Sequence, residues 1–111
     1  MFQRMKQGAV DVVYGETPLS LDHVEGLQTL LEECQEAGQP RVVFDLRDVA
    51  LIDSAGLELL LDAQEECGRR GGTLKLAAPN DLCREILTLT GIDRRFEIFD
   101  DPVRAVGSFV G

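Results

Sequence analysis

The spacing of hydrophobic residues changes period along the chain and predicts strands that alternate with helices. Apolar residues recur at helical spacing in long segments, and short β-branched or aromatic runs such as RVVFDL lie between them. Strands are expected over residues 2–5, 9–14, 41–46, 73–78 and 96–99, with a turn at 6–8, and helices are expected to begin near residues 22, 54, 80 and 101. The sequence therefore predicts one α/β domain over residues 1–111, with a mixed, mostly parallel β-sheet packed with about four α-helices.

Capping signals predict where two of these helices begin. Asp22 is followed three residues later by Glu25, an acidic version of the capping box, and Gly38 ends that helix. Near the other end of the chain, Asp101 precedes Pro102, which matches the preferences of the N-cap and of the first helical position. Both helices are therefore expected to start at an aspartate.

The third helix has an expected cap and an expected inner face. Asn80 or Asp81 supplies the cap, because either side chain can accept a hydrogen bond from the first turn. Apolar residues then recur at helical spacing, which predicts that Leu82, Ile86 and Leu89 face the core.

The stretch LIDSAGLELLL, residues 51–61, joins a strand-like run to a helix-like run and places Asp53 and Ser54 at the junction. Either side chain can cap the helix. The position also suits a regulated hydroxyl, because partners often meet α/β domains where strands feed helices, and a helix N-terminus accepts a phosphate group. Ala55 and Gly56 add little bulk, so a partner could approach Ser54 closely. Both roles, helix cap and regulated hydroxyl, stay open at this point.

Composition narrows the classes of partner. The chain has 20 acidic and 11 basic residues, a formal net charge of −9 that argues against a nucleic-acid partner and suits a basic protein or simple solubility. Hydrophobic residues make up 44% and charged residues 28%, as in a soluble globular protein. The start lacks a signal-peptide core, and no apolar run is long enough for membrane insertion, so a cytoplasmic protein is expected.

Residues with catalytic or metal-binding chemistry are few. Cys34, Cys67 and Cys83 fall at inward helical positions and are expected to be buried free thiols in a reducing compartment. His23 is the single histidine, and the chain has no CxxC, so neither a metal nor a cofactor is predicted. No GxSxG motif surrounds Ser54, and a nucleophilic serine needs a nearby base, so an enzyme is not expected.

Four segments in order resemble the STAS domain, and most closely the free-standing anti-sigma factor antagonists of bacteria. They are RVVFDLRDVALIDSAGLELLL, GGTLKLAAP, LTLTGI and RRFEIFDD, and the resemblance runs from about Val42 to the C-terminus. Its most specific part is the Asp-Ser-small-Gly-Leu core, here 53–57. The resemblance implies a STAS-like single domain in which a mixed sheet is flanked by helices.

The resemblance also implies partner switching controlled by phosphorylation of Ser54. In such systems the unphosphorylated antagonist binds an anti-sigma factor, itself a serine kinase with a GHKL-type ATP site, and the sigma factor is released. Phosphorylation of the motif serine ends this binding, and a PP2C-type phosphatase restores it. We therefore expect those two proteins as partners, with no nucleic acid and no membrane insertion.

The same resemblance gives the expected contact segment around Ser54. The expected partner-binding residues are Asp22, Asp53, Ala55, Gly56, Leu57 and Glu58. Many family members carry a second serine where this chain has Ala55, so Ser54 is the one candidate acceptor in the motif. Residues 15–18, Gly-Glu-Thr-Pro, depart from the Gly-Glu-Leu-Asp segment that such antagonists often show before the first helix, and Asp22 comes later in the chain.

A second function belongs to a different class of protein. The chain could be a constitutive STAS subunit of a larger assembly, such as a lipid-transport ABC system. In that case the edge around Ser54 is a permanent contact, and the hydroxyl serves only as a helix cap. Kinase or phosphatase genes beside this one favour the switch, and transporter genes favour the subunit.

Overall fold

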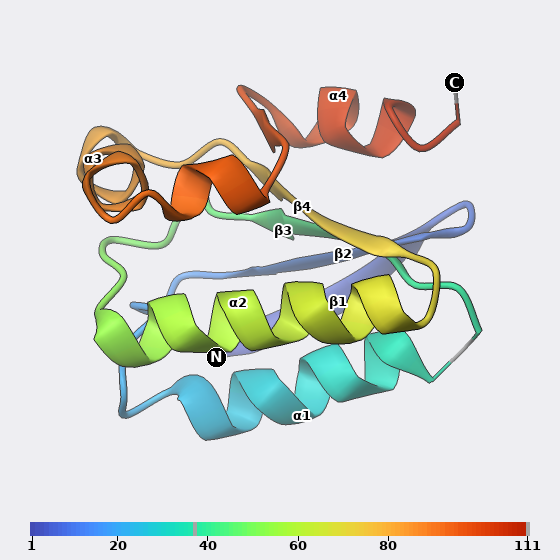
Figure 1. Ribbon diagram of the computed structural model, residues 1–111, viewed down its shortest axis with the longest axis horizontal. Coiled ribbons are helices and arrows are strands. Elements are labelled where there is room, and N and C mark those ends of the chain that lie inside the picture. The colour runs from blue at the N-terminus through green and yellow to red at the C-terminus, as the bar shows by residue number, and fades with distance from the viewer. Residues whose placement is uncertain (37, 111) are drawn as a thin grey trace.

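The structure is a computed structural model that describes residues 1–36 and 38–110, and it has the predicted α/β architecture (Figure 1). The strands are β1 Phe2–Gln7, β2 Val10–Gly15, β3 Arg41–Asp45, β4 Thr73–Ala77 and β5 Ile98–Phe99. The helices are α1 Val24–Gln35, α2 Ser54–Arg69, α3 Asp81–Leu89 and α4 Pro102–Gly107, with a short 3₁₀ helix, η1, at Ile92–Arg95. The mixed, mostly parallel sheet and the four α-helices confirm the predicted fold class.

The five strands follow one another across the sheet in sequence order. β1 pairs antiparallel with β2 as the predicted hairpin, and every later neighbour pairs in parallel. The hairpin turn is tighter than predicted, because pairing continues to Gln7 opposite Val10. Gly8 takes a φ of 63°, a value that glycine adopts freely in a two-residue hairpin.

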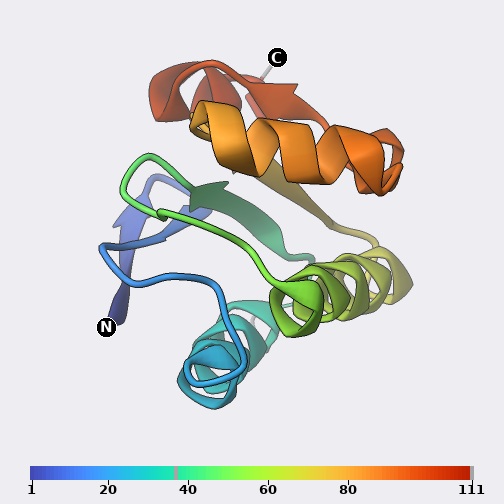
Figure 2. The same ribbon diagram turned by 90° about the vertical axis from the view of Figure 1, so that its left-hand side faces the viewer.

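Helices cover both faces of the sheet (Figures 1 and 2). α1 and α2 lie side by side on one face, where the main core contains Val42 and Phe44 of β3. α4 lies on the other face over a smaller cluster that includes Val43 and Ala105. β3 is therefore buried on both sides, which explains its continuous apolar run and confirms that prediction.

The predicted inner face of α3 is wrong at two of its three positions. Leu82 and Leu89 are 49% and 78% exposed, whereas Cys83 and Leu87 are fully buried. Ile86, the third predicted position, is partly buried against the core. The helix carries apolar residues in two overlapping phases, and periodicity alone does not choose between them.

The cap at the start of α3 selects the phase that is used. Asn80 is the N-cap, and its side-chain oxygen accepts a hydrogen bond of 2.7 Å from the backbone N–H of Cys83. The amide nitrogen of Asn80 donates to the carbonyl oxygens of Val49 and Ala50, both at 3.2 Å. The Cys83 thiol also contacts the Val49 carbonyl at 3.4 Å. These contacts hold Cys83 inward and leave its neighbour Leu82 outside.

The start of α1 also differs from the prediction. His23 is the N-cap and makes no side-chain capping bond, so Asp22 does not form the expected capping box. The reason is a turn before the helix, in which the His23 N–H donates to the Ser20 carbonyl at 2.8 Å. This turn moves the first helical residue to Val24, and Glu25 becomes too close to the cap to complete the box.

Other local predictions agree with the structure. Asp101 is the N-cap of α4 and accepts a hydrogen bond of 2.9 Å from the Arg104 N–H, with Pro102 in the first turn. The cysteines are free and buried, as expected. Among the described residues, no helix combines the length and the apolarity needed to cross a membrane.

Candidate functional site at the start of α2

Asp53 caps α2, and Ser54 does not. Asp53 has an extended backbone, and its Oδ1 accepts a hydrogen bond of 2.9 Å from the backbone N–H of Gly56. Ser54 is the first helical residue and is exposed. Within the described part of the chain, its hydroxyl makes no hydrogen bond that could hold it against the protein. The capping role left open by the sequence therefore belongs to the aspartate, and the serine hydroxyl is free.

The second oxygen of the Asp53 carboxylate ties the helix to the loop before α1. Its Oδ2 accepts a hydrogen bond of 3.0 Å from the backbone N–H of Leu21. Hydrogen bonds from the Gly56 and Leu21 N–H groups, in that order, lower the pKa of Asp53 below its usual value. One ionised side chain thus fixes both the start of α2 and the position of the segment that carries Asp22.

A short parallel bridge between Leu19 and Ile52 completes this junction. The Leu19 N–H donates to the Leu51 carbonyl at 2.9 Å, and the Asp53 N–H donates to the Leu19 carbonyl at 3.0 Å. Gly56 packs directly onto this bridge, because a Cβ there would lie 2.3 Å from the Leu19 carbonyl oxygen. Close approach within the fold therefore accounts for the glycine, which we had expected to admit a partner.

The predicted contact residues divide into an exposed group and a buried group. Ser54, Glu58 and Asp22 are exposed, and Asp53 and Ala55 are half-buried. Gly56 and Leu57 are buried in the free chain, where they pack inside the domain. A partner contact at any of these residues stays a prediction, and only the exposed and half-buried ones are open to a partner in the free domain.

Three leucines on the segments around this edge are exposed, which the sequence analysis did not predict. Leu21, Leu51 and Leu82 are 70%, 39% and 49% exposed. Leu21 is held by Asp53, and Leu82 follows the Asn80 cap that bonds the 49–50 loop. For Leu21 the sequence did contain a signal of exposure, because this leucine stands between polar residues in a turn-rich segment. The edge thus offers apolar side chains as well as carboxylates.

The surroundings of Ser54 are defined by the start of α2, with neither a hydrogen-bonded base nor a metal-ligand cluster among the described residues. His23, the single histidine, lies with its Nδ1 3.1 Å from the Ser20 hydroxyl, and in the described residues no hydrogen bond joins its side chain to Ser54. No group of three or more potential metal ligands occurs within residues 1–36 and 38–110. Ser54 instead stands at the positive end of the α2 dipole, where backbone N–H groups favour an anion.

The family follows from a match over most of the chain. A model of the STAS domain family matches residues 4–105. This chain belongs to the STAS domain family. The match includes the strand before the junction, the Asp53–Ser54 pair and the capped helices that follow, so the edge described above is part of the STAS domain itself.

A curated relative and a solved structure point to one group within the family. One relative is a Thermotoga maritima protein that is provisionally named an anti-sigma factor antagonist. It is 30% identical to this chain over 71 residues, which span 64% of this chain and 63% of the relative. A crystal structure of a provisionally named anti-sigma factor antagonist from the same organism has a TM-score of 0.90 and 23% identity, covering 96% of this chain and 92% of that one. The STAS domain described here is thus similar to anti-sigma factor antagonists.

Two further structures show how widely the fold is used. The Bacillus cell fate determinant SpoIIAA, solved in its phosphorylated form, has a TM-score of 0.74 and 18% identity, covering 98% of this STAS domain and 99% of SpoIIAA. The mouse anion transporter Slc26a9 has a TM-score of 0.79 and 16% identity, covering 92% of this domain but 18% of the transporter. At these identities the likeness establishes the fold alone.

Proposed function

We propose that this STAS domain is an anti-sigma factor antagonist that works by partner switching, with Ser54 as the phosphorylated residue. The observation that carries the proposal is the free, exposed hydroxyl of Ser54 beside an aspartate that already caps the helix. A modification there leaves the cap intact. The similarity to anti-sigma factor antagonists supplies the class of partner.

Electrostatics explains how a phosphate at this position would act on a partner and not on the fold. Phosphorylation adds about −1.5 to −2 charges at neutral pH. At the first residue of α2, the helix dipole and the early N–H groups stabilise this charge, so the helix stays folded. Asp53 and Glu58 already make the surrounding surface negative. A docked protein would meet both the added bulk and the added charge.

The proposed partners follow from the resemblance and fit this surface. The unphosphorylated domain binds an anti-sigma factor that is a GHKL-type serine kinase, and a PP2C-type phosphatase removes the phosphate. Asp22, Ala55 and Glu58 would contact the kinase, with Leu21 and Leu51 adding apolar area. Since this edge is acidic, the complementary kinase surface carries basic side chains.

Phosphate mapping tests the proposal directly. The purified domain is incubated with Mg²⁺–ATP and the GHKL-type kinase that co-purifies with it, and the phosphate is located by mass spectrometry. The expected product carries one phosphate at Ser54, and a Ser54→Ala variant is not labelled. Ser20→Ala is the matched control, because Ser20 lies on a neighbouring loop and contacts His23. Phosphate on another residue, or kinase binding by Ser54→Glu as tight as by the wild type, contradicts the proposal.

A constitutive STAS subunit is the second candidate, because the same fold occurs within a transporter. That candidate assigned Ser54 only a capping role, and the structure gives the cap to Asp53. Co-purification of the endogenous partner separates the two functions. A transport ATPase that stays bound to both Ser54→Ala and Ser54→Glu variants would favour the subunit.

A further inference from the structure

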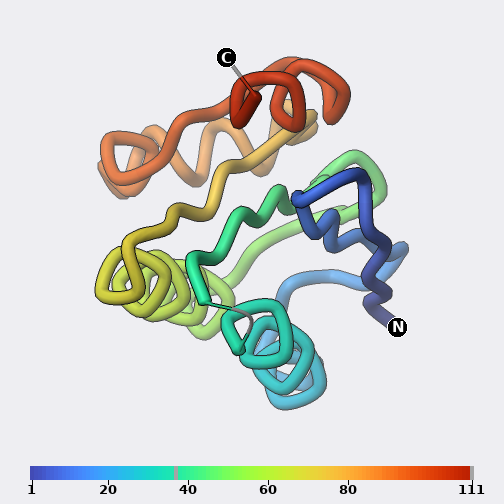
Figure 3. The backbone as a smooth tube through the Cα atoms, turned by 90° about the vertical axis from the view of Figure 1, so that its right-hand side faces the viewer, coloured from blue at the N-terminus to red at the C-terminus, as the bar shows by residue number. Residues whose placement is uncertain are grey.

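A groove of about 720 Å³ runs between α1 and α2, on the face of the domain away from the sheet. The two helices lie side by side in every view, and Figure 3 shows them from their C-terminal ends. The floor is apolar and is formed by Leu31 of α1 and by Leu59 and Ala63 of α2. At the end nearer Ser54 the groove is lined by Leu21 and Ala55.

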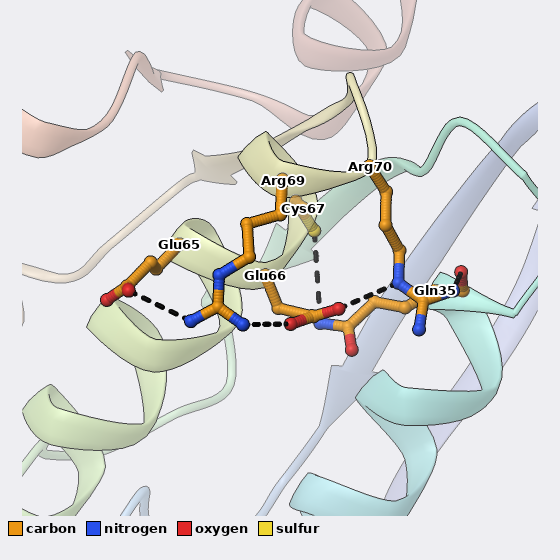
Figure 4. Close-up of polar contacts among 6 residues, drawn as sticks. All are labelled: Gln35, Glu65, Glu66, Cys67, Arg69 and Arg70. Carbon is orange, nitrogen blue, oxygen red and sulfur yellow. Dashed lines mark hydrogen bonds and ion pairs between the residues drawn. The ribbon is translucent and has the colours of Figure 1, made fainter.

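An ion-pair cluster occupies the other end of the groove (Figure 4). Arg70 Nε lies 2.8 Å from a Glu66 carboxylate oxygen, and Arg70 Nη1 donates to the Gln35 carbonyl at 2.9 Å, which joins α2 to the end of α1. Arg69 pairs with Glu65 and Glu66, each at 3.0 Å. The two cations in the groove lining are therefore already neutralised.

Four carboxylates along the groove have no such partner in the described residues. Glu32 lies on α1 and Glu36 is the C-cap residue of that helix, while Glu58 and Asp62 lie on α2, so each rim presents two acids four positions apart. Like charges at this spacing repel one another along each helix. A cation placed between the two rims would relieve this repulsion on both sides at once.

We propose that this groove binds a basic amphipathic helix of a partner protein. Apolar residues of that helix would lie on the floor, while its Lys or Arg residues would reach the carboxylates on both rims. The small side chain of Ala63 lets a third helix approach the floor. The groove extends along α2 from Ala55 to Arg70, roughly 22 Å at ~1.5 Å per residue, the length of about 15 helical residues.

Charge argues against a second copy of this chain as the occupant, because each copy carries a formal charge of −9. The proposal does not depend on phosphorylation of Ser54, since the four rim carboxylates and the floor are present without it. Failure of one proposal therefore leaves the other standing.

Binding of a synthetic peptide tests the groove. The probe is a fluorescein-labelled helical peptide of about 16 residues, with leucine along one face and lysine elsewhere. The groove variant replaces all four rim acids: Glu32→Gln, Glu36→Gln, Glu58→Gln and Asp62→Asn. The control variant makes the same change in net charge at exposed acids outside the groove: Glu16→Gln, Asp48→Asn, Asp81→Asn and Glu85→Gln.

Fluorescence anisotropy should give a dissociation constant at least about tenfold weaker for the groove variant and less than about threefold weaker for the control. Amide chemical shifts in the wild-type complex should change along α1 and α2. A peptide with leucine replaced by serine should not bind. Equal losses of peptide affinity in the groove and control variants would show that binding is general electrostatic attraction and would overturn the proposal. Binding of the serine peptide as tight as that of the leucine peptide would overturn it as well. A dimer of the free protein that the groove variant dissociates would also overturn it, by assigning the groove to a second copy.

Discussion

The Asp53 carboxylate accepts a hydrogen bond of 2.9 Å from the Gly56 N–H, and this bond separates two roles that the sequence places side by side. The aspartate holds α2 and the loop before α1, while the adjacent Ser54 hydroxyl faces solvent. The cap of α2 therefore does not depend on the Ser54 hydroxyl.

Replacing the two neighbours with alanine should therefore have unequal effects on stability. Ser54→Ala should change the free energy of unfolding by less than about 0.5 kcal/mol, as expected for an exposed side chain outside the cap. Asp53→Ala should be clearly more destabilising, because it leaves the N–H groups of Gly56 and Leu21 without their acceptor. Urea unfolding followed by circular dichroism measures both. Equal losses of stability in the two variants would contradict the assignment of the cap to Asp53.

The pH dependence of stability should carry the signature of Asp53. Its pKa is lowered in the folded state, mainly by the Gly56 N–H and then by the Leu21 N–H. The resulting stabilisation is present above the unfolded pKa of about 3.9 and is lost as the pH falls through the lower, folded value. An Asp53→Asn variant cannot titrate there. Between about pH 5 and pH 3, its free energy of unfolding should fall less than that of the wild type. Parallel curves would contradict this assignment.

Any side chain at position 56 should lower the stability of the fold. A Cβ at this position would lie 2.3 Å from the Leu19 carbonyl oxygen and 2.8 Å from Leu19 Cγ, so Gly56→Ala should destabilise the fold by about 1–3 kcal/mol. Gly56→Val should cost more. Gly68 is a matched control in the same helix, because a Cβ there meets nothing within 4 Å.

Gly68→Ala should stabilise the domain by up to about 1 kcal/mol, because alanine is the better helix former. The midpoint temperatures of thermal unfolding of Gly56→Ala and Gly68→Ala should shift in opposite directions from that of the wild type. A Gly56→Ala protein as stable as the wild type would show that the Leu19–Ile52 bridge can move away from the added Cβ without loss of stability.

Sequence patterns predicted this fold well because they depend on local chemistry. The double-sided burial of β3 follows from its unbroken apolar run, and the start of α4 follows from the order Asp101-Pro102. The same logic placed Asp53 and Ser54 at the start of α2. It could not choose the cap, since both side chains accept hydrogen bonds and the choice depends on where each one points.

Features that depend on distant contacts were not predictable in this way. The bridge between Leu19 and Ile52 joins segments 33 positions apart, and it explains Gly56. The phase of α3 depends on hydrogen bonds from Asn80 to the 49–50 loop, so periodicity alone wrongly predicts that Leu82 faces the core. The groove between α1 and α2 likewise needed the packing of two helices before its acidic rims could be recognised.

The cysteine thiols should be unreactive in the folded protein. Burial is the main cause of the raised pKa of each thiol and raises that of Cys67 to about 11. Thiolates are the reactive form, so titration with a thiol reagent at about pH 8 should label none of the three in the native state. All three should react in denaturant. Fast labelling of one native thiol would reveal local opening, and mass spectrometry would identify the site.

Lys75 should hold the C-terminal turn against the sheet. Its side chain is 7% exposed, its Nζ donates to the Ser108 hydroxyl at 2.7 Å, and it lies 4.1 Å from the centre of the Phe109 ring. The Phe99 ring is farther away, at 5.7 Å. Phe109→Leu should therefore lower the free energy of unfolding by about 1–2 kcal/mol, more than Phe99→Leu, and should speed hydrogen exchange in α4.

A double-mutant cycle separates the cation–ring interaction of Lys75 and Phe109 from simple packing. In a Lys75→Met background the ring faces no charge, so Phe109→Leu should cost about 1 kcal/mol less than it does in the wild type. Phe99→Leu, measured in the same two backgrounds, should show a smaller difference because its ring is more distant. A coupling of zero for Phe109 would mean that the ring contributes packing alone, and that the polar contacts of Lys75 with Ser108 and Glu97 hold the lysine in place.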